Sequence, residues 1–418
     1  MVPYGLVLAG GGAKGAYQIG AWKALRELGI EFSIVAGASI GAINGALIAS
    51  DAYEKAISLW DSVTIEKGIN ITAELPNPNN LFSMKNFSVL LREVIKNGGI
   101  DASPTKVLLE EYISEEDVRN SGVDLGIVAF QLSGGMTPLE LRLKDIPEGQ
   151  LLDYILASAN VPGVSNIGPD GEKFLDGGFY DNTPVGFLRR NGINRLIVLD
   201  ISNMKGYAHS LNIYNAEVVY IRPYDTEELG AAFDFSFEMK EKRMTLGYND
   251  AMKAFGRLLG NIYYFTPDEF MGMIEAYTAS TCYELEKLAW SLGVKHDVVY
   301  TADEFLRAVK VAFEEKKAAE EQKAESPVIY TQIKKAVSSL KKEGTEDAPE
   351  EHKSESPVIY KQIKKAVSSL KKEGTEDAPE EHKSEGPVIY KQIKKAVSSF
   401  KKDDTDKDVL AILDSIII

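Results

Sequence analysis

A serine flanked by glycines, Gly37-Ala38-Ser39-Ile40-Gly41, has the residue types and spacing of a nucleophile elbow. It lies between an apolar run typical of a buried strand and a segment with helical spacing. On such a sharp turn the hydroxyl stands at the N-terminus of the following helix, whose dipole stabilises developing negative charge. The pattern therefore predicts nucleophilic attack by Ser39 on a carbonyl. The simpler interpretation is a tight helix start that the serine caps.

A serine nucleophile needs a base, and the four histidines of the chain form no pattern that supplies one. His352 and His382 occupy equivalent positions in repeated linkers, while His209 and His296 have no flanking motif. A carboxylate is therefore favoured over a histidine triad. The segment Phe174-Leu175-Asp176-Gly177-Gly178 places one Asp at the end of a short apolar run, where the glycines let the chain turn away. By itself this segment also fits an ordinary Asp-Gly turn.

A glycine-rich loop, Gly10-Gly11-Gly12-Ala13-Lys14-Gly15, follows the first apolar run and precedes the first helical segment. Glycines in this position let successive backbone amides point at one anion. Phosphate binding is the alternative interpretation of the loop. The loop lacks the Gly-Lys-Ser/Thr ending of a P-loop, however, and the dinucleotide-binding spacing fits only by choosing among its glycines.

Taken in chain order, the glycine loop, the serine elbow and Asp176-Gly177-Gly178 resemble the motifs of the patatin-like phospholipases. Ala157-Ser158-Ala159-Asn160-Val161-Pro162 and Asp181-Asn182-Thr183-Pro184-Val185 also resemble the segments that flank the family's aspartate. The resemblance covers roughly residues 2–221. It implies a three-layer α/β/α fold with a mainly parallel central sheet, and a hydrolase that cleaves acyl esters of lipids. It implies no metal and no other cofactor.

The resemblance also implies roles for individual residues. Ser39 would be the nucleophile and Asp176 the base, so that two residues replace the usual three. Lys14 stands where an Arg is common in the family, and we expect little change because both side chains are cationic. The remaining residues support these groups: Gly10, Gly11, Gly12, Lys14 and Gly15 in the oxyanion loop, Gly37 and Gly41 in the elbow, and Gly177 and Gly178 after the aspartate.

The elements that must position these residues follow from hydrophobic periodicity. Strand-like and helix-like segments alternate over the first two hundred residues, which predicts a mainly parallel sheet with helices on both faces. The predicted strands are 6–9, 32–36, 124–132, 195–201 and, more weakly, 217–221; the predicted helices are 13–28 and 40–50. Helices at 83–97 and 104–113 are the predicted cap over the site. From about residue 233 to 319 the pattern is wholly helical. The predicted domains are therefore a catalytic domain (1–232), a helical extension (233–325) and a tail (326–418).

The tail contains an internal repeat of about thirty residues, since Ser326–Glu355 recurs as Ser356–Glu385 with a single change. A third, partial copy begins at Gly386. Each copy predicts a Lys-rich amphipathic helix followed by an acidic linker, and the three helices are 327–342, 357–372 and 387–402. Their basic faces could lie on anionic lipid head groups. Their apolar faces could equally bind a protein partner or form a self-association seam, and both roles stay open.

Charge and hydropathy limit the remaining function classes. The chain has 418 residues and a formal net charge of −15, which argues against nucleic-acid binding. The tail holds equal numbers of basic and acidic residues, so residues 1–325 carry the whole excess. No basic segment precedes the first apolar run, and no run reaches the length of a membrane span. We expect a cytoplasmic protein without signal peptide or transmembrane segment, peripheral at a membrane where the tail helices bind lipid.

These observations predict a serine acyl hydrolase that cleaves fatty-acyl esters of lipids, of the phospholipase A or lysophospholipase type. A transacylase that uses the same two residues is one alternative, and it differs only in the acyl acceptor. A non-catalytic lipid-binding or scaffolding protein, acting through the amphipathic repeats, is the other. Covalent reactivity at Ser39 separates this last alternative from the first two.

Overall fold

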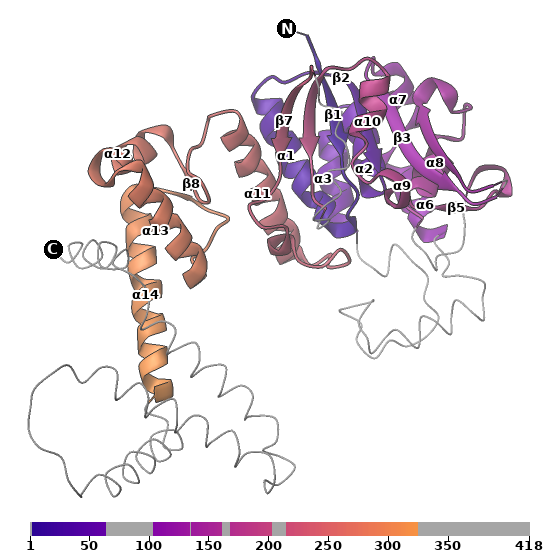
Figure 1. Ribbon diagram of the computed structural model, residues 1–418. Coiled ribbons are helices and arrows are strands. Elements are labelled where there is room, and N and C mark those ends of the chain that lie inside the picture. Colours follow the sequence, from indigo (N-terminus) through magenta and orange to yellow (C-terminus); the bar gives the residue numbers. More distant parts are fainter. Residues whose placement is uncertain (1, 64–102, 134, 161–167, 203–214, 325–418) are drawn as a thin grey trace, which may run out of the picture. The chain divides into compact units, whose positions relative to one another are not determined.

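The computed structural model of the chain describes residues 2–63, 103–133, 135–160, 168–202 and 215–324 (Figure 1). Contacts group the chain into two compact units, Met1–Glu275 with Lys295–Ala302 and Ala276–Val294 with Asp303–Ile418. The predicted cap helix at 83–97 and the three tail helices lie outside the described residues. None of the described helices is both long and apolar enough to cross a membrane.

The first unit is built on a seven-stranded sheet of order β4-β3-β2-β1-β6-β7, in which β5 also pairs with β3. The five predicted strands are all present, and they pair parallel to one another. Two strands that the sequence did not predict, β4 and β5, pair antiparallel with β3. The strands are β1 (Tyr4–Leu8), β2 (Phe32–Ala38), β3 (Asp124–Gln131), β4 (Thr137–Arg142), β5 (Phe174–Leu175), β6 (Arg195–Leu199) and β7 (Glu217–Ile221).

Helices cover both faces of this sheet. Alternate residues of β1 point to opposite faces, so Leu6 and Leu8 join one buried cluster while Val7 joins another. The first cluster includes α1 (Ala16–Glu27), α2 (Ile40–Ala49), α3 (Tyr53–Ser62) and α8 (Leu151–Ser158), and the second includes α10 (Val185–Arg190). The predicted three-layer α/β/α fold with a mainly parallel sheet is therefore confirmed. The short helices are η1 (Gly12–Gly15), α6 (Ser103–Tyr112), α7 (Glu115–Asn120), η2 (Leu143–Asp145), η3 (Pro169–Gly171), α9 (Gly178–Asp181) and η4 (Thr226–Leu229).

A long helix after the sheet, α11 (Phe237–Ala254), packs along α1. Two glycines allow the backbones to approach closely. A Cβ built on Gly20 would lie 1.8 Å from the carbonyl oxygen of Met244, and one built on Gly247 would lie 1.9 Å from that of Tyr17. Any larger residue at either position would therefore push the two helices apart. The predicted domain boundary at residue 232 stays a prediction, but α11 is part of the first compact unit.

The sequence predicted a wholly helical segment after α11, but the structure also contains strands there. Between α11 and α12 (Pro267–Tyr277) lies a two-residue strand, β8 (Tyr264–Phe265), which pairs with β9 (Val299–Tyr300). Aromatic residues have high strand propensity, and both residues of β8 are fully buried. The other helices are α13 (Ala279–Leu292), which ends before Gly293 with a φ of 74°, and α14 (Ala302–Ala324).

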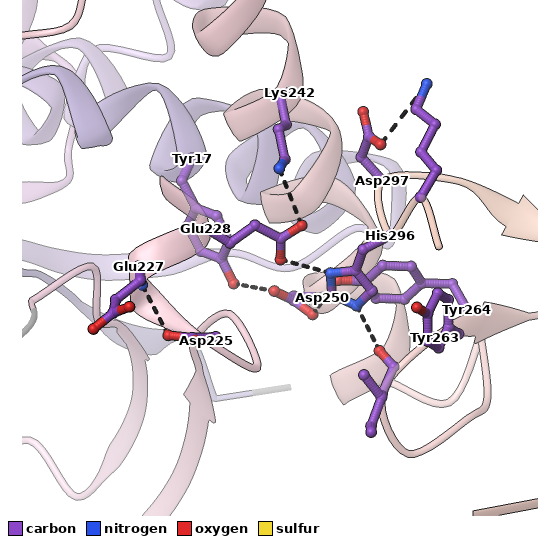
Figure 2. Close-up of polar contacts among 12 residues, drawn as sticks. Tyr17, Asp225, Glu227, Glu228, Lys242, Asp250, Tyr263, Tyr264, His296 and Asp297 are labelled. Atoms are coloured by element: carbon purple, nitrogen blue, oxygen red, sulfur yellow. Dashed lines mark hydrogen bonds and ion pairs between the residues drawn. The ribbon is translucent and has the colours of Figure 1, made fainter. Parts of the chain in front are cut away.

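A buried carboxylate connects α1, α11 and β8. The Asp250 carboxylate accepts hydrogen bonds from the hydroxyl of Tyr17 at 2.6 Å and from that of Tyr264 at 2.7 Å (Figure 2). Burial raises the pKa of Asp250, although the two hydroxyl hydrogen bonds act against this shift. Fully satisfied polar groups of this kind fix one arrangement of the elements that contribute them.

A second buried contact links η4 to the residues just before β9. The ring of His296 lies with Nε2 2.7 Å from the Ile262 carbonyl oxygen and Nδ1 2.7 Å from a carboxylate oxygen of Glu228 (Figure 2). Because a carbonyl can only accept, Nε2 is the donor in the first contact. The Lys242 ammonium lies 3.2 Å from the other oxygen of Glu228. Burial alone would raise the pKa of Glu228, but His296 and Lys242 outweigh it and lower that pKa.

Candidate active site

The predicted elbow is a strained turn between β2 and α2. Ser39 has φ 56° and ψ −128°, in the half of conformational space that non-glycine residues rarely occupy. Its two glycine neighbours make the turn sterically feasible. A Cβ on Gly37 would lie 2.2 Å from the carbonyl carbon of Gly41, and a Cβ on Gly41 would lie 2.3 Å from the Leu8 carbonyl oxygen. Strain that persists in a well-packed core is typical of a functional position.

Asp176 follows β5 directly and lies beside this turn. Its amide donates to the Asn160 carbonyl oxygen at 2.8 Å, which fixes its backbone, and its side chain is only 7% exposed. The carboxylate accepts a hydrogen bond from the amide of Gly178 at 2.8 Å, and the Ser39 side chain lies close enough to lower its pKa. Burial raises the pKa of Asp176, and the contacts with Ser39 and Gly178 only partly offset the shift. The structure therefore brings the predicted nucleophile and base together.

A buried serine that the sequence did not single out as a site residue connects the two. Ser158, at the end of α8, accepts a hydrogen bond from the amide of Ser39 at 2.9 Å and donates to the Val128 carbonyl at 2.6 Å. Its own carbonyl accepts from the amide of Gly177 at 2.9 Å. One residue thus holds the elbow, strand β3 and the turn after Asp176 in a fixed arrangement. Its position in a segment similar to the family pattern was the signal that could have found it.

The glycine loop lies against the elbow at its first residue. A Cβ on Gly10 would be 3.1 Å from the Cβ of Ser39 and 2.5 Å from the side-chain oxygen of Asn182. The Gly10 amide already donates to the Asn182 carbonyl at 3.1 Å, and the Asn182 side-chain amide donates to the Gly10 carbonyl at 3.2 Å. Asn182 therefore ties the loop to the segment after Gly178. Gly10 permits this close approach but has no free amide to offer.

Within the part of the chain that the structure describes, the amides of the next two loop residues donate no backbone hydrogen bond. Among the described residues, no acceptor faces the amide of Gly11 or that of Gly12. Gly12 has φ +59°, and a Cβ there would lie 2.3 Å from the Ala232 carbonyl oxygen, so only glycine fits. That same carbonyl accepts a hydrogen bond from the amide of Ala13 at 2.7 Å. Two backbone donors are consequently available next to the elbow for an anionic oxygen.

The last two predicted loop residues are buried in the base of the loop. Lys14 is 6% exposed, and burial, together with the nearby charge of Arg243, lowers the pKa of its ammonium group. A Cβ on Gly15 would lie 2.5 Å from the side chain of Ile40, the residue after the nucleophile. The Gly15 carbonyl accepts a hydrogen bond from the Asn44 side chain at 3.0 Å. Gly15 therefore lets the start of α1 pack directly on α2.

A family assignment agrees with this geometry. The family model described as patatin-like phospholipase matches residues 6–189, the span that contains the glycine loop, Ser39 and Asp176. Residues 6–189 are therefore a patatin-like phospholipase region. The match ends within α10, so the patatin-like region as matched includes neither β6 and β7 nor α11.

The relatives that the chain matches are much longer proteins. The chain is 28% identical over 240 residues to "Lysophospholipase nte1" of Aspergillus terreus, covering 53% of this chain and 14% of that protein. It is 29% identical over 208 residues to "Patatin-like phospholipase domain-containing protein 7" of Rattus norvegicus, covering 47% and 13%. It is 28% identical over 213 residues to "Neuropathy target esterase sws" of Drosophila melanogaster, covering 48% and 13%. The chain thus spans about one seventh of the length of these relatives.

Two solved structures align with most of the chain at low similarity. VipD of Legionella pneumophila is 14% identical with a TM-score of 0.33, covering 90% of this chain and 81% of VipD. ExoU of Pseudomonas aeruginosa, crystallised with SpcU, is 18% identical with a TM-score of 0.30, covering 88% and 68%. The family assignment of the patatin-like region therefore depends on the sequence match and not on these two structures.

Proposed function

We propose that the chain is a serine acyl hydrolase that cleaves fatty-acyl esters of lipids with Ser39 as nucleophile and Asp176 as base. The observation that carries this proposal is the proximity of the two side chains at a strained elbow. Burial raises the pKa of Asp176, which makes its carboxylate a stronger proton acceptor than an exposed one. The names of the relatives, a lysophospholipase and an esterase, support an ester of a lipid as substrate.

In the first step the Ser39 oxygen attacks the carbonyl carbon of the ester while Asp176 takes the hydroxyl proton. The carbonyl oxygen becomes negatively charged, and the amides of Gly11 and Gly12 donate to it. One such donor is typically worth about 3 kcal/mol of transition-state stabilisation. Ser39 is also the N-cap of α2, so the helix dipole favours the same negative charge. When the tetrahedral intermediate collapses, Asp176 returns the proton to the leaving alcohol and an acyl-enzyme remains.

In the second step water replaces the alcohol. Asp176 takes a proton from the water as its oxygen attacks the acyl carbonyl, and the same two amides hold the oxyanion. Collapse breaks the bond to Ser39, whose oxygen recovers the proton from Asp176, and the fatty acid leaves. Each proton that Asp176 accepts is returned, so the enzyme ends in its starting state. If an alcohol occupies the position of the water, the same chemistry is transacylation.

Covalent labelling with a fluorescent fluorophosphonate, together with turnover of a lysophospholipid and of a soluble short-chain ester, tests the proposal. We expect wild type to be labelled and active, and Ser39→Ala and Asp176→Asn to lose turnover. Ser58→Ala is the matched control, because Ser58 is an exposed serine within α3. Wild type that is neither labelled nor active would support the non-catalytic lipid-binding alternative. Labelling that persists in Ser39→Ala would show that the nucleophile is another residue.

The acyl acceptor and the tail need separate measurements. Adding a lysophospholipid acceptor and following acyl-transfer products separates the hydrolase from the transacylase. The membrane role of the tail helices and the cytoplasmic location remain predictions, because the described residues end at 324. Co-sedimentation with anionic vesicles tests the membrane role, comparing the full chain with a variant whose tail lysines are replaced by glutamine. Equal binding of the two would leave the protein-contact interpretation of the tail.

A further inference from the structure

A buried arginine of α11 contacts the backbone of the glycine loop. Arg243 is fully buried, and its guanidinium donates to four carbonyl oxygens, three of them at the end of η4 and in the turn after it. These three are Leu229 at 2.7 Å, Ala231 at 3.0 Å and Asp234 at 2.5 Å. The fourth is the carbonyl of Ala13, 3.2 Å from Nη1 and 230 residues away in sequence. Arg243 thus connects the glycine loop to a turn that lies beyond the family match.

The charge of this group explains why it needs so many carbonyl partners. Burial lowers the pKa of Arg243 to about 10, and the nearby carboxylate of Asp234 acts against that shift. The guanidinium is still protonated at neutral pH. A buried cation is costly unless polar groups surround it, so carbonyl dipoles must keep their negative ends directed at it. Each carbonyl that faces Arg243 is thereby fixed in orientation.

That orientation determines where the loop amides point. The Ala13 carbonyl is bound by Arg243, while the Ala13 amide is bound by the Ala232 carbonyl at 2.7 Å. Ala232 lies within the turn that Arg243 holds, and it is in contact with Gly12. The peptide groups on both sides of Ala13 are therefore locked. The free amides of Gly11 and Gly12 precede this locked unit directly, and Gly10 before them touches Ser39.

We propose that Arg243 is the positioning residue of the oxyanion loop. It holds the Ala13 carbonyl and the Leu229–Asp234 turn so that the amides of Gly11 and Gly12 stay aimed at the oxygen that becomes negative when Ser39 attacks. This inference depends on the proposed hydrolase function. A residue that merely joined α11 to the rest of the unit would contribute to folding but not to the stabilisation of that oxygen.

Lys240 provides the matched control on the same helix. It is also buried, and it pairs with the carboxylate of Asp61 on α3, without contact to the glycine loop. The experiment compares Arg243→Met, Arg243→Lys and Lys240→Met in the full chain. For each we would measure the unfolding temperature, kcat and KM for a soluble short-chain ester, and the inhibition constant of a trifluoromethyl ketone. The tetrahedral adduct of this inhibitor with a serine places a negative oxygen at the oxyanion position.

We expect Arg243→Met to lower kcat by about tenfold to a hundredfold with KM changed by less than about twofold. The amides of Gly11 and Gly12 remain in this variant, but their orientation toward the oxyanion is no longer fixed. Ketone affinity should fall by the same factor. Arg243→Lys should lose less than Arg243→Met, since an ammonium has three donors for four carbonyls. Lys240→Met should keep kcat and ketone affinity within about twofold of wild type even if it unfolds at a lower temperature.

Arg243→Met with wild-type kcat and ketone affinity would overturn the proposal. If that variant does not fold, kcat and ketone affinity are compared in Arg243→Lys instead. Wild-type values of both in Arg243→Lys would also overturn the proposal. Failure of the proposed function would be visible in another way. Wild type itself would then show neither turnover nor labelling of Ser39.

Discussion

The backbone strain at Ser39 should be measurable as a stability difference between two substitutions. Ser39→Ala and Ser39→Gly both remove the hydroxyl that lies beside Asp176. The two variants differ in that glycine tolerates the observed φ of 56° and alanine does not. A non-glycine residue in this region costs roughly 1–3 kcal/mol. Against this, glycine costs about 0.4–1 kcal/mol through the greater entropy of the unfolded chain. We therefore expect Ser39→Gly to be more stable than Ser39→Ala by roughly 1 kcal/mol.

Ser58 supplies the comparison with ordinary backbone geometry. It is exposed and lies within α3, where glycine is about 1 kcal/mol less favourable than alanine. The order of the two variants should therefore reverse, with Ser58→Gly less stable than Ser58→Ala. The two sites should then differ by roughly 2 kcal/mol in the glycine-minus-alanine free energy of unfolding. A general effect of glycine on the unfolded chain would change the free energy of unfolding in the same direction at both sites. It therefore cannot explain opposite signs.

Urea unfolding of the full chain gives these free energies. Trp22 and Trp60 lie in the first compact unit and Trp290 in the second, so all variants should carry Trp290→Phe to make the fluorescence report on the first unit. The reasoning is refuted if Ser39→Gly is less stable than Ser39→Ala by as much as the Ser58 pair. That result would mean that residue 39 has an ordinary backbone conformation in solution, and the elbow assignment would lose its main support.

Four further predictions follow from burial, charge and close packing. Asp176→Asn should abolish turnover, yet at pH 7 it should be at least as stable as wild type. Because burial raises the pKa of Asp176 in the folded state, the ionised carboxylate destabilises the fold at any pH above that pKa. Each unit of pKa shift is worth about 1.4 kcal/mol. For the same reason the acid limb of kcat/KM should lie above the ordinary aspartate range near 3.9. Glu228→Gln should lower the unfolding temperature at pH 7, and the deficit should shrink below about pH 4, since a lowered folded pKa gives stability that is lost as pH falls through it. Gly41→Ala should destabilise by more than about 2 kcal/mol, because its Cβ would lie 2.3 Å from the Leu8 carbonyl, whereas Gly272→Ala meets nothing within 4 Å and should not destabilise α12.

The parts of the site that the sequence predicted are local ones. Strand, turn and helix meet within a few residues of Ser39, and periodicity together with glycine spacing is enough to place such a unit. The partner residues could not be predicted in this way. Ser158, Asn182 and Arg243 contact the elbow and the loop from 119, 172 and 230 residues away, and nothing in their local sequence indicates which backbone group they meet. Likewise β4 was missed because an edge strand buries little apolar surface, so Thr137–Arg142 lacks the apolar run of β1.

The boundary of the family match is therefore not the boundary of the proposed site. The matched region ends at residue 189, but the carbonyl that receives the Ala13 amide belongs to Ala232. Helix α11 is held against α1 by the backbone contacts at Gly20 and Gly247, and α1 begins directly after the glycine loop. A shift of α11 along α1 would thus move Arg243 and the loop together. A fragment that stopped at residue 189 would lose β6, a parallel partner of β1, and also the turn that contacts the proposed oxyanion loop.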